Sequence, residues 1–266
     1  MRLYFAIIIF ALPNLSLCIE GADTVAQALT NQQLVQSGRE AFLNRCSGCH
    51  GETADGNGPA APMLSPKPRN LVTGLFKFRS TPSGVLPTVS DLLRTLDQGI
   101  PGSAMPPFKE LSSQEKLSLV AYIRSLRPEF SETKSDQQSL AIPAPPNSIF
   151  SKKLNLLSAA KRGKLIFAKG CLNCHGASGK GDGPSAEGLT DSYDQPIRPA
   201  NLNMPELKSG KTARDLFKVM STGLDGSPMP SYTEVFTEAQ RWDVVAFIFY
   251  LRGKTAGIYT EKDSIE

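Results

Sequence analysis

The chain has 266 residues and a formal net charge of +4; 40% of its residues are hydrophobic and 20% are charged. This balance supports a packed core and excludes wholesale disorder, and the length suits one large or two modest domains. Its two histidines, His50 and His175, each directly follow a C-x-x-C motif, which leaves none for a histidine-dependent catalytic triad or a further histidine-ligated metal.

The amino terminus predicts an export signal. An apolar run covers residues 3–12 and ends at Pro13. It is shorter than the roughly 20 residues that a membrane span needs, and its pattern is typical of a secretory signal peptide. We predict a signal peptide over residues 1–18 and a periplasmic mature protein. An uncleaved anchor and lipid attachment at Cys18 are the alternatives.

Most of the remaining chain is an internal repeat. Cys46 and Cys171 are 125 residues apart, as are His50 and His175. The match extends to further pairs of segments: 56–59 with 181–184, 68–71 with 199–202, 99–106 with 223–230, and 120–123 with 245–248. Such self-similarity indicates two copies of one unit. We predict domain 1 over 31–128, domain 2 over 152–256, and a Pro-rich linker over 129–151 that favours an extended, semi-rigid connector.

Each copy predicts the same order of elements: a helix, a cysteine motif, a loop, a short helix, a second loop and a final helix. Residues 112–115 and 237–240 are capping boxes that start the two final helices. Stop signals follow at Pro128 and Gly253. Because no alternating strand pattern is present, the predicted fold class is all-α.

Both cysteine motifs have the form C-x-x-C-H, which is typical of c-type haem attachment. The two thiols bond to the porphyrin, and the adjacent imidazole becomes the proximal iron ligand. A redox dithiol and half of a zinc site are the alternatives, but neither a βαβ pattern nor spare cysteines and histidines accompany the motifs. We predict two covalently bound haem c groups, held by Cys46, Cys49, His50, Cys171, Cys174 and His175.

Methionine is the remaining candidate for the sixth iron ligand. Only Met105 and Met229 correspond to each other in the repeat, and each precedes a proline in a Gly/Pro-rich loop. Met63 and Met204 have no matching methionine, and Met220 is predicted to lie in the core. We predict that Met105 and Met229 complete the two coordination spheres. Two core methionines matched by shared ancestry are the alternative.

These motifs resemble those of the class I cytochrome c family, and nearly all of the predicted mature chain is similar to a dihaem member with two tandem domains. The resemblance implies a few helices and long loops wrapped round a covalent haem in each domain. It also implies that the first and last helices of each domain cross, through Gly38, Phe42 and Tyr122 in domain 1 and Gly163, Phe167 and Phe247 in domain 2.

The resemblance further places Asn70 and Asn201 in loops near the haem propionates. Each is therefore a candidate for a hydrogen bond in the haem pocket. An ordinary role as a loop turn residue is the alternative.

The expected function is the relay of single electrons, with no substrate bond changed. The protein is expected to act as a soluble carrier or as the electron-transfer subunit of a respiratory or dehydrogenase complex. Redox proteins are the expected partners, peripheral association with a membrane respiratory complex is one such arrangement, and no motif indicates nucleic acid binding. The alternative is a dihaem redox enzyme, peroxidase-like or thiosulfate-oxidising, with one catalytic haem; additional distal histidines or a cysteine ligand are missing for it.

A basic cluster opens domain 2. It suits either the steering of an acidic redox partner or an ordinary solvated helix face. Its members are Lys152, Lys153, Lys161, Arg162, Lys164 and Lys169.

Overall fold

The computed structural model describes residues 32–127, 129–132 and 135–265, so the predicted signal peptide lies outside the described residues. Within these ranges, no helix combines the length and the hydropathy that a membrane crossing requires. The helices in domain 1 and the linker are α2 (Gln32–Arg45), α3 (Ser47–His50), η1 (Ala61–Met63), α4 (Val89–Gln98), α5 (Ser113–Ser125), α6 (Glu129–Glu132), η2 (Ser135–Gln137) and α7 (Asn147–Phe150). Those that follow are α8 (Lys153–Gly170), α9 (Leu172–His175), α10 (Ala213–Thr222), α11 (Glu238–Thr255) and η3 (Glu261–Asp263).

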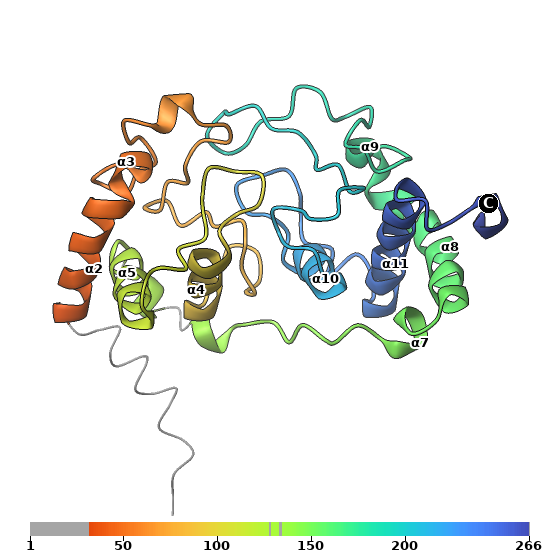
Figure 1. Ribbon diagram of the computed structural model, residues 1–266, viewed down its shortest axis with the longest axis horizontal. Coiled ribbons are helices and arrows are strands. Elements are labelled where there is room, and N and C mark those ends of the chain that lie inside the picture. The colour runs from red at the N-terminus through yellow and green to blue at the C-terminus, as the bar shows by residue number, and fades with distance from the viewer. Residues whose placement is uncertain (1–31, 128, 133–134, 266) are drawn as a thin grey trace, which may run out of the picture.

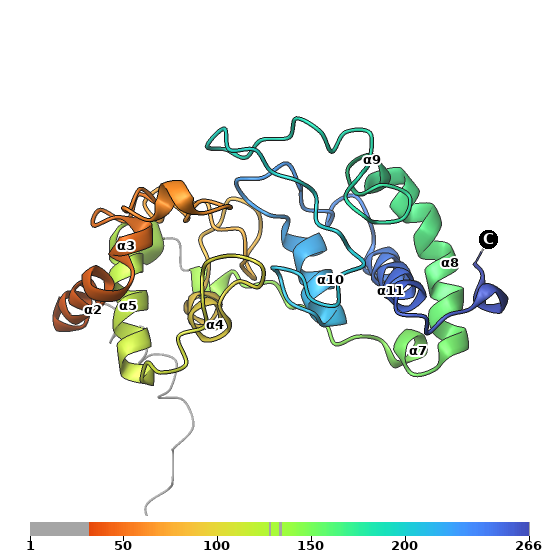
Figure 2. The same ribbon diagram turned by 45° about the horizontal axis from the view of Figure 1, so that its top comes forward.

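The two copies form two lobes that lie side by side (Figures 1 and 2). Each lobe places its first long helix, α2 or α8, toward the outside and its short helix, α4 or α10, toward the other lobe. Among the described residues, β-type pairing is limited to two isolated bridges, Thr190 with Pro196 and Leu207 with Gly210. The all-α expectation is confirmed, and the long loops meet in the middle of the molecule.

Each lobe contains one close helix crossing, between its first and last long helices. A Cβ atom added at Gly38 of α2 would overlap the backbone oxygen of Ser118 in α5, and one added at Gly163 would overlap that of Asp243 in α11. Beside each glycine an aromatic pair fills the crossing, with ring centroids 5.1 Å apart for Phe42 and Tyr122. The centroids of Phe167 and Phe247 are 5.2 Å apart. The crossing implied by the family resemblance is thus present in both domains.

The helix starts follow the sequence closely. The amide of Glu115 donates to Ser112 Oγ at 3.2 Å, and the amide of Gln240 donates to Thr237 Oγ at 3.3 Å, so both predicted capping boxes are confirmed. The stop predicted at Gly253 is wrong, because α11 continues to Thr255. The ring of Tyr259 packs where a Cβ of residue 253 would lie, so this contact, rather than a helix end, requires the glycine.

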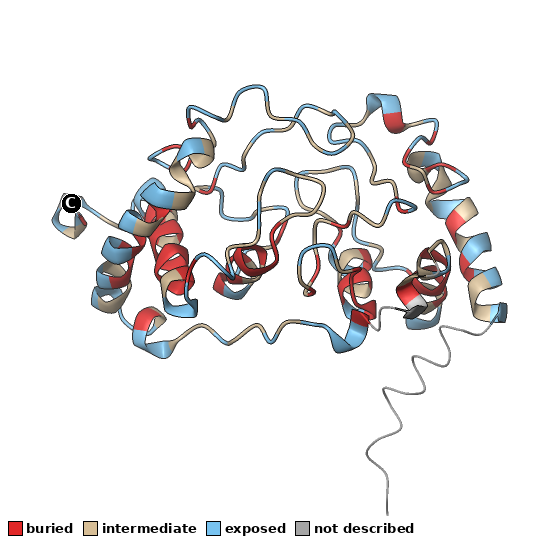
Figure 3. Cartoon of the chain, turned by 180° about the vertical axis from the view of Figure 1, so that it is seen from behind, coloured by how far each residue is buried: buried red, intermediate tan, exposed pale blue. Residues whose placement is uncertain are grey.

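The apolar cores lie on the facing sides of the helices (Figure 3). Domain 2 has a larger aromatic cluster, in which Trp242 stacks on Phe217 with centroids 4.2 Å apart and meets Phe150 edge-on. In the alignment of the two repeats, Leu117 of domain 1 corresponds to Trp242. Helix α7 and the carboxyl-terminal segment also pack on domain 2, through Ile149 and Ile265.

The linker is attached to both domains. The amide of Leu140 donates to Ser80 O of domain 1 at 2.7 Å, and Arg214 Nη2 of domain 2 donates to Ile142 O at 2.8 Å. Residues 139–146, which include the three prolines that favour an extended connector, contain no helix or turn, and the short helices α6, η2 and α7 lie on either side of them in the described part of the linker.

Candidate haem sites

Each C-x-x-C-H motif forms a single helical turn. The amide of His50 donates to Cys46 O at 2.8 Å, and the amide of His175 donates to Cys171 O at the same distance. This turn fixes both thiols and the imidazole of a motif relative to one another. Phe42 and Phe167, from the helix crossings, lie beside the imidazoles with centroid separations of 6.4 and 6.5 Å.

The two imidazoles are oriented by a backbone carbonyl. His50 Nδ1 lies 2.9 Å from Arg69 O, and His175 Nδ1 lies 3.1 Å from Ala200 O. Because a carbonyl oxygen can only accept, Nδ1 carries the proton and Nε2 keeps its lone pair. Burial lowers the pKa of both histidines, which favours the neutral ring that an iron ligand requires.

The loops that supply these carbonyls fold back in the same way in both domains. The amide of Gly56 donates to His50 O at 2.8 Å, and the amide of Gly181 donates to His175 O at 2.9 Å. Gly56 has φ of +84°, and a Cβ there would lie 2.7 Å from Pro68 O. Glycine therefore lets the returning loop approach the motif closely enough to reach the histidine.

The first cysteine of each motif, Cys46 or Cys171, packs against the apolar core of its domain. Burial raises the pKa of Cys46 to about 11 and that of Cys171 to about 12 in the polypeptide. Among the described residues, no three histidine, cysteine, aspartate or glutamate side chains lie close enough to hold a metal ion, so protein groups alone do not build a zinc site there.

The two methionine loops share most of their internal hydrogen bonds. The amide of Ile100 donates to Met105 O, and the amide of Leu224 donates to Met229 O, both at 3.0 Å. Ser103 Oγ and Ser227 Oγ each close the loop with a 2.7 Å bond, to the carbonyls of residues 100 and 224.

The burial of the methionine side chains agrees with the sequence argument. Met105 and Met229 are half-buried, and Met105 packs against the same core as Cys46. Met63 is 81% exposed and Met204 is 51% exposed, whereas Met220 is buried, as expected for a core residue. Ligation by Met105 and Met229 stays a prediction.

The two asparagines form turns. Asn70 Oδ1 accepts from the amides of Val72 at 2.9 Å and Thr73 at 3.2 Å. Asn201 Oδ1 accepts from the amide of Asn203 at 3.0 Å. Their oxygens thus take the turn role, and a contact between Asn70 or Asn201 and a haem stays a prediction.

A buried donor next to the motif of domain 1 fits the acidic edge of a porphyrin. Arg69 Nη1 is buried and has no hydrogen-bond partner in the part of the chain that the structure describes. Its guanidinium lies 5.3 Å from the ring centroid of Tyr193 in domain 2. A buried guanidinium N–H of this kind suits a propionate carboxylate. Together with the thiols and the oriented imidazoles, it makes the residues present a good fit for covalent haem.

Two residues of the basic cluster have acidic partners that the sequence did not reveal. Arg162 donates two hydrogen bonds to Asp243, of 2.9 and 2.6 Å. Lys153 Nζ lies 2.8 Å from Asp263 Oδ1. The charge available for steering a partner is therefore smaller than the sequence indicates.

Sequence reasoning also missed residues near the motifs. Tyr232 donates its hydroxyl proton to Gly170 O at 2.7 Å, directly before Cys171. Phe108 occupies the equivalent place in domain 1, so a comparison of the two copies reveals this difference. Arg79, whose contacts are described below, lies outside the matched segments.

Known proteins support the duplicated arrangement. The family described as Cytochrome c matches residues 35–127 and again residues 160–252. Two relatives, each described as the Cbb3-type cytochrome c oxidase subunit FixP, come from Sinorhizobium medicae (strain WSM419) and Rhizobium meliloti (strain 1021). Both are 27% identical over 60% of this chain, and the matched part spans only 46% and 47% of their own lengths.

A solved structure matches more of the molecule. A chain of the Kuenenia stuttgartiensis reducing HAO-like protein complex superposes with a TM-score of 0.74 and 33% sequence identity. The match covers 81% of this chain and 96% of that chain, so the similarity extends across both domains.

Proposed function

Because this protein belongs to the cytochrome c family and binds two covalent haem c groups, we propose that it relays single electrons as the dihaem subunit of a larger oxidoreductase complex. The FixP relatives are named as oxidase subunits, and the solved relative belongs to a protein complex. These descriptions favour a complex subunit over a free carrier. The exported location that the amino terminus predicts, the periplasm, is part of this proposal.

The side chains of each domain would hold the haem iron through residues that are already fixed in the polypeptide. When bound, haem supplies a one-electron couple between ferrous and ferric iron. His50 and His175 present Nε2 because Nδ1 donates to a carbonyl. Met105 and Met229 would hold the iron together with these histidines, from loops that their own hydrogen bonds hold in shape. Fixed ligands reduce the rearrangement that accompanies each electron transfer.

The equivalence of the two methionine loops carries this proposal. An enzyme with one catalytic haem needs one iron with an open position, and the two loops have matching hydrogen bonds rather than one open and one closed form. The whole sequence contains no histidine beyond His50 and His175. The redox-enzyme alternative is therefore disfavoured.

Carbon monoxide tests the proposal. The ferrous native protein should not bind it at either haem, and Met105→Ala and Met229→Ala should each create one site that does. Each variant should also lose half of the weak long-wavelength absorption of ferric methionine ligation while both haems stay attached. Binding of carbon monoxide to one haem of the native protein would support the enzyme alternative instead.

A further inference from the structure

Arg79 is a charged residue in the interior of the molecule. It lies in the loop of domain 1 before α4 and is 1% exposed. Two of its hydrogen bonds stay within this loop, from Nε to Pro82 O at 3.2 Å and from Nη1 to Phe76 O at 3.1 Å. They orient the guanidinium so that its third nitrogen, Nη2, faces domain 2.

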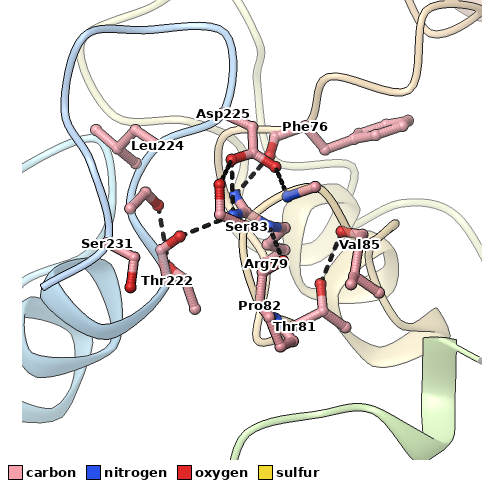
Figure 4. A network of polar contacts seen from close by, with 12 residues as sticks. Phe76, Arg79, Thr81, Pro82, Ser83, Val85, Thr222, Leu224, Asp225 and Ser231 are labelled. Carbon is pink, nitrogen blue, oxygen red and sulfur yellow. Dashed lines mark hydrogen bonds and ion pairs between the residues drawn. The ribbon is translucent and has the colours of Figure 1, made fainter. Parts of the chain in front are cut away.

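The remaining bonds of Arg79 cross to domain 2 (Figure 4). Nη2 donates to Thr222 O at 2.7 Å and to Asp225 Oδ1 at 2.8 Å. Asp225 also accepts from Ser83 Oγ at 2.8 Å and, through Oδ2, from the amide of Gly84 at 3.0 Å. All three donors to this carboxylate belong to domain 1.

These contacts fall on the loop that carries Met229. Thr222 ends α10, and Asp225 lies between it and Met229. The backbone bond from Leu224 to Met229 O joins the two sides of the same loop, and Leu224 directly precedes Asp225, so the carboxylate that Arg79 holds is one residue from the bond that closes the loop. Pro101 is the equivalent residue in domain 1, and it has no side-chain acceptor.

We propose that Arg79 of domain 1 is a positioning residue for Met229 of domain 2. By holding Asp225 and Thr222, it keeps the methionine loop closed, so that one domain controls the lability of an iron ligand in the other. The inference rests on the proposed ligation by Met229. It assigns no such role to domain 1's own methionine loop.

Competition with imidazole in the ferric holoprotein measures this lability. The long-wavelength methionine band is followed in a Met105→Ala background, where only Met229 contributes to it. In the Arg79→Met variant, imidazole should displace Met229, and so remove this band, at about tenfold lower concentration. The reason is that the open form of the loop, which imidazole requires, becomes more populated. Asp225→Asn should act in the same direction, and the double variant should show less than the product of the two effects.

Matched controls separate positioning from general loosening. Arg94 also bridges the domains, by bonds to Ser209 O at 2.7 Å and to Asp215 at 3.3 Å, but it does not bond the loop of Met229. Arg94→Met should leave the competition unchanged. In a Met229→Ala background, Arg79→Met should leave the band of Met105 unchanged.

Each contrary result has a distinct meaning. If Met229→Ala alone removes no long-wavelength absorption, the proposed ligation is wrong. If it removes that absorption but Arg79→Met and Asp225→Asn leave the competition unchanged, the positioning role is wrong. An equal effect of Arg94→Met would also overturn it. If the Arg79→Met variant does not mature, Asp225→Asn still tests the proposal. The Asp225 side chain is 11% exposed, and asparagine has nearly the same shape as aspartate.

Discussion

The loops of Met105 and Met229 share most of their internal hydrogen bonds but have different surroundings. Gly99, Ile100 and Pro101, in the first loop, line a cavity of about 370 Å³ between the domains. Asp225, in the second loop, is held by three donors from domain 1. A duplicated domain can thus keep its local geometry in both copies while the contact between the copies stabilises only one of them.

The helix crossings are the region where the two domains should respond alike, and where the largest effect is expected. Gly38→Ala and Gly163→Ala should each lower the free energy of unfolding by about 3 kcal/mol, because the added Cβ overlaps a backbone oxygen that cannot move alone. Thermal unfolding of the holoprotein measures this. Ser37→Ala is the control, since Ser37 is the exposed neighbour of Gly38 in α2. Tolerance at one crossing only would show that the domains differ here as well.

The glycines that begin the methionine loops should distinguish the two copies. Gly99 has φ of +62° and Gly223 has φ of +68°, and an added Cβ would lie 2.6 Å from Met105 O or from the Ser231 amide. Gly99→Ala should cost about 2 kcal/mol, and Gly223→Ala more, because it also disturbs the contact between Asp225 and Arg79.

Gly102→Ala separates the backbone strain of these variants from their close contacts. Gly102 has φ of +67° with open space around it, so this change should cost only about 1 kcal/mol. The unfolding temperatures of the three variants give the comparison. A smaller cost at Gly223 than at Gly99 would contradict the tighter hold on the second loop.

The smallest expected effect concerns the serines that close the loops. Ser103→Ala should cost about 1 kcal/mol, because Ser103 Oγ donates to Ile100 O and also accepts from the Met105 amide at 3.2 Å. Ser227→Ala should cost about half as much, because Ser227 Oγ bonds Leu224 O without a second bond like that of Ser103, and because Arg79 still holds that loop through Asp225. The denaturant concentration at which half of the methionine band is lost measures the cost of each variant. Equal costs would mean that the contact between domains does not reinforce the loop.

The sequence was informative where the chemistry is local. The C-x-x-C-H motifs, the capping boxes and the matched methionines each lie within a few residues or repeat at a fixed offset, so a pattern alone predicts them. The end of α11 was missed because Tyr259, a contact outside the helix, explains Gly253. The ion pair of Arg79 and Asp225 could not be predicted from the sequence, because 146 residues separate its members and only the docking of two domains brings them together.

The contacts of Arg79 and of the linker also bear on modularity. Although the chain reads as two units that a cut near residue 140 would separate, domain 1 alone would expose a guanidinium that has lost two of its four hydrogen bonds. Domain 2 alone would leave Asp225 without its three donors. A single-haem fragment is therefore an incomplete protein, and measurements on such fragments describe neither half as it exists in the intact chain.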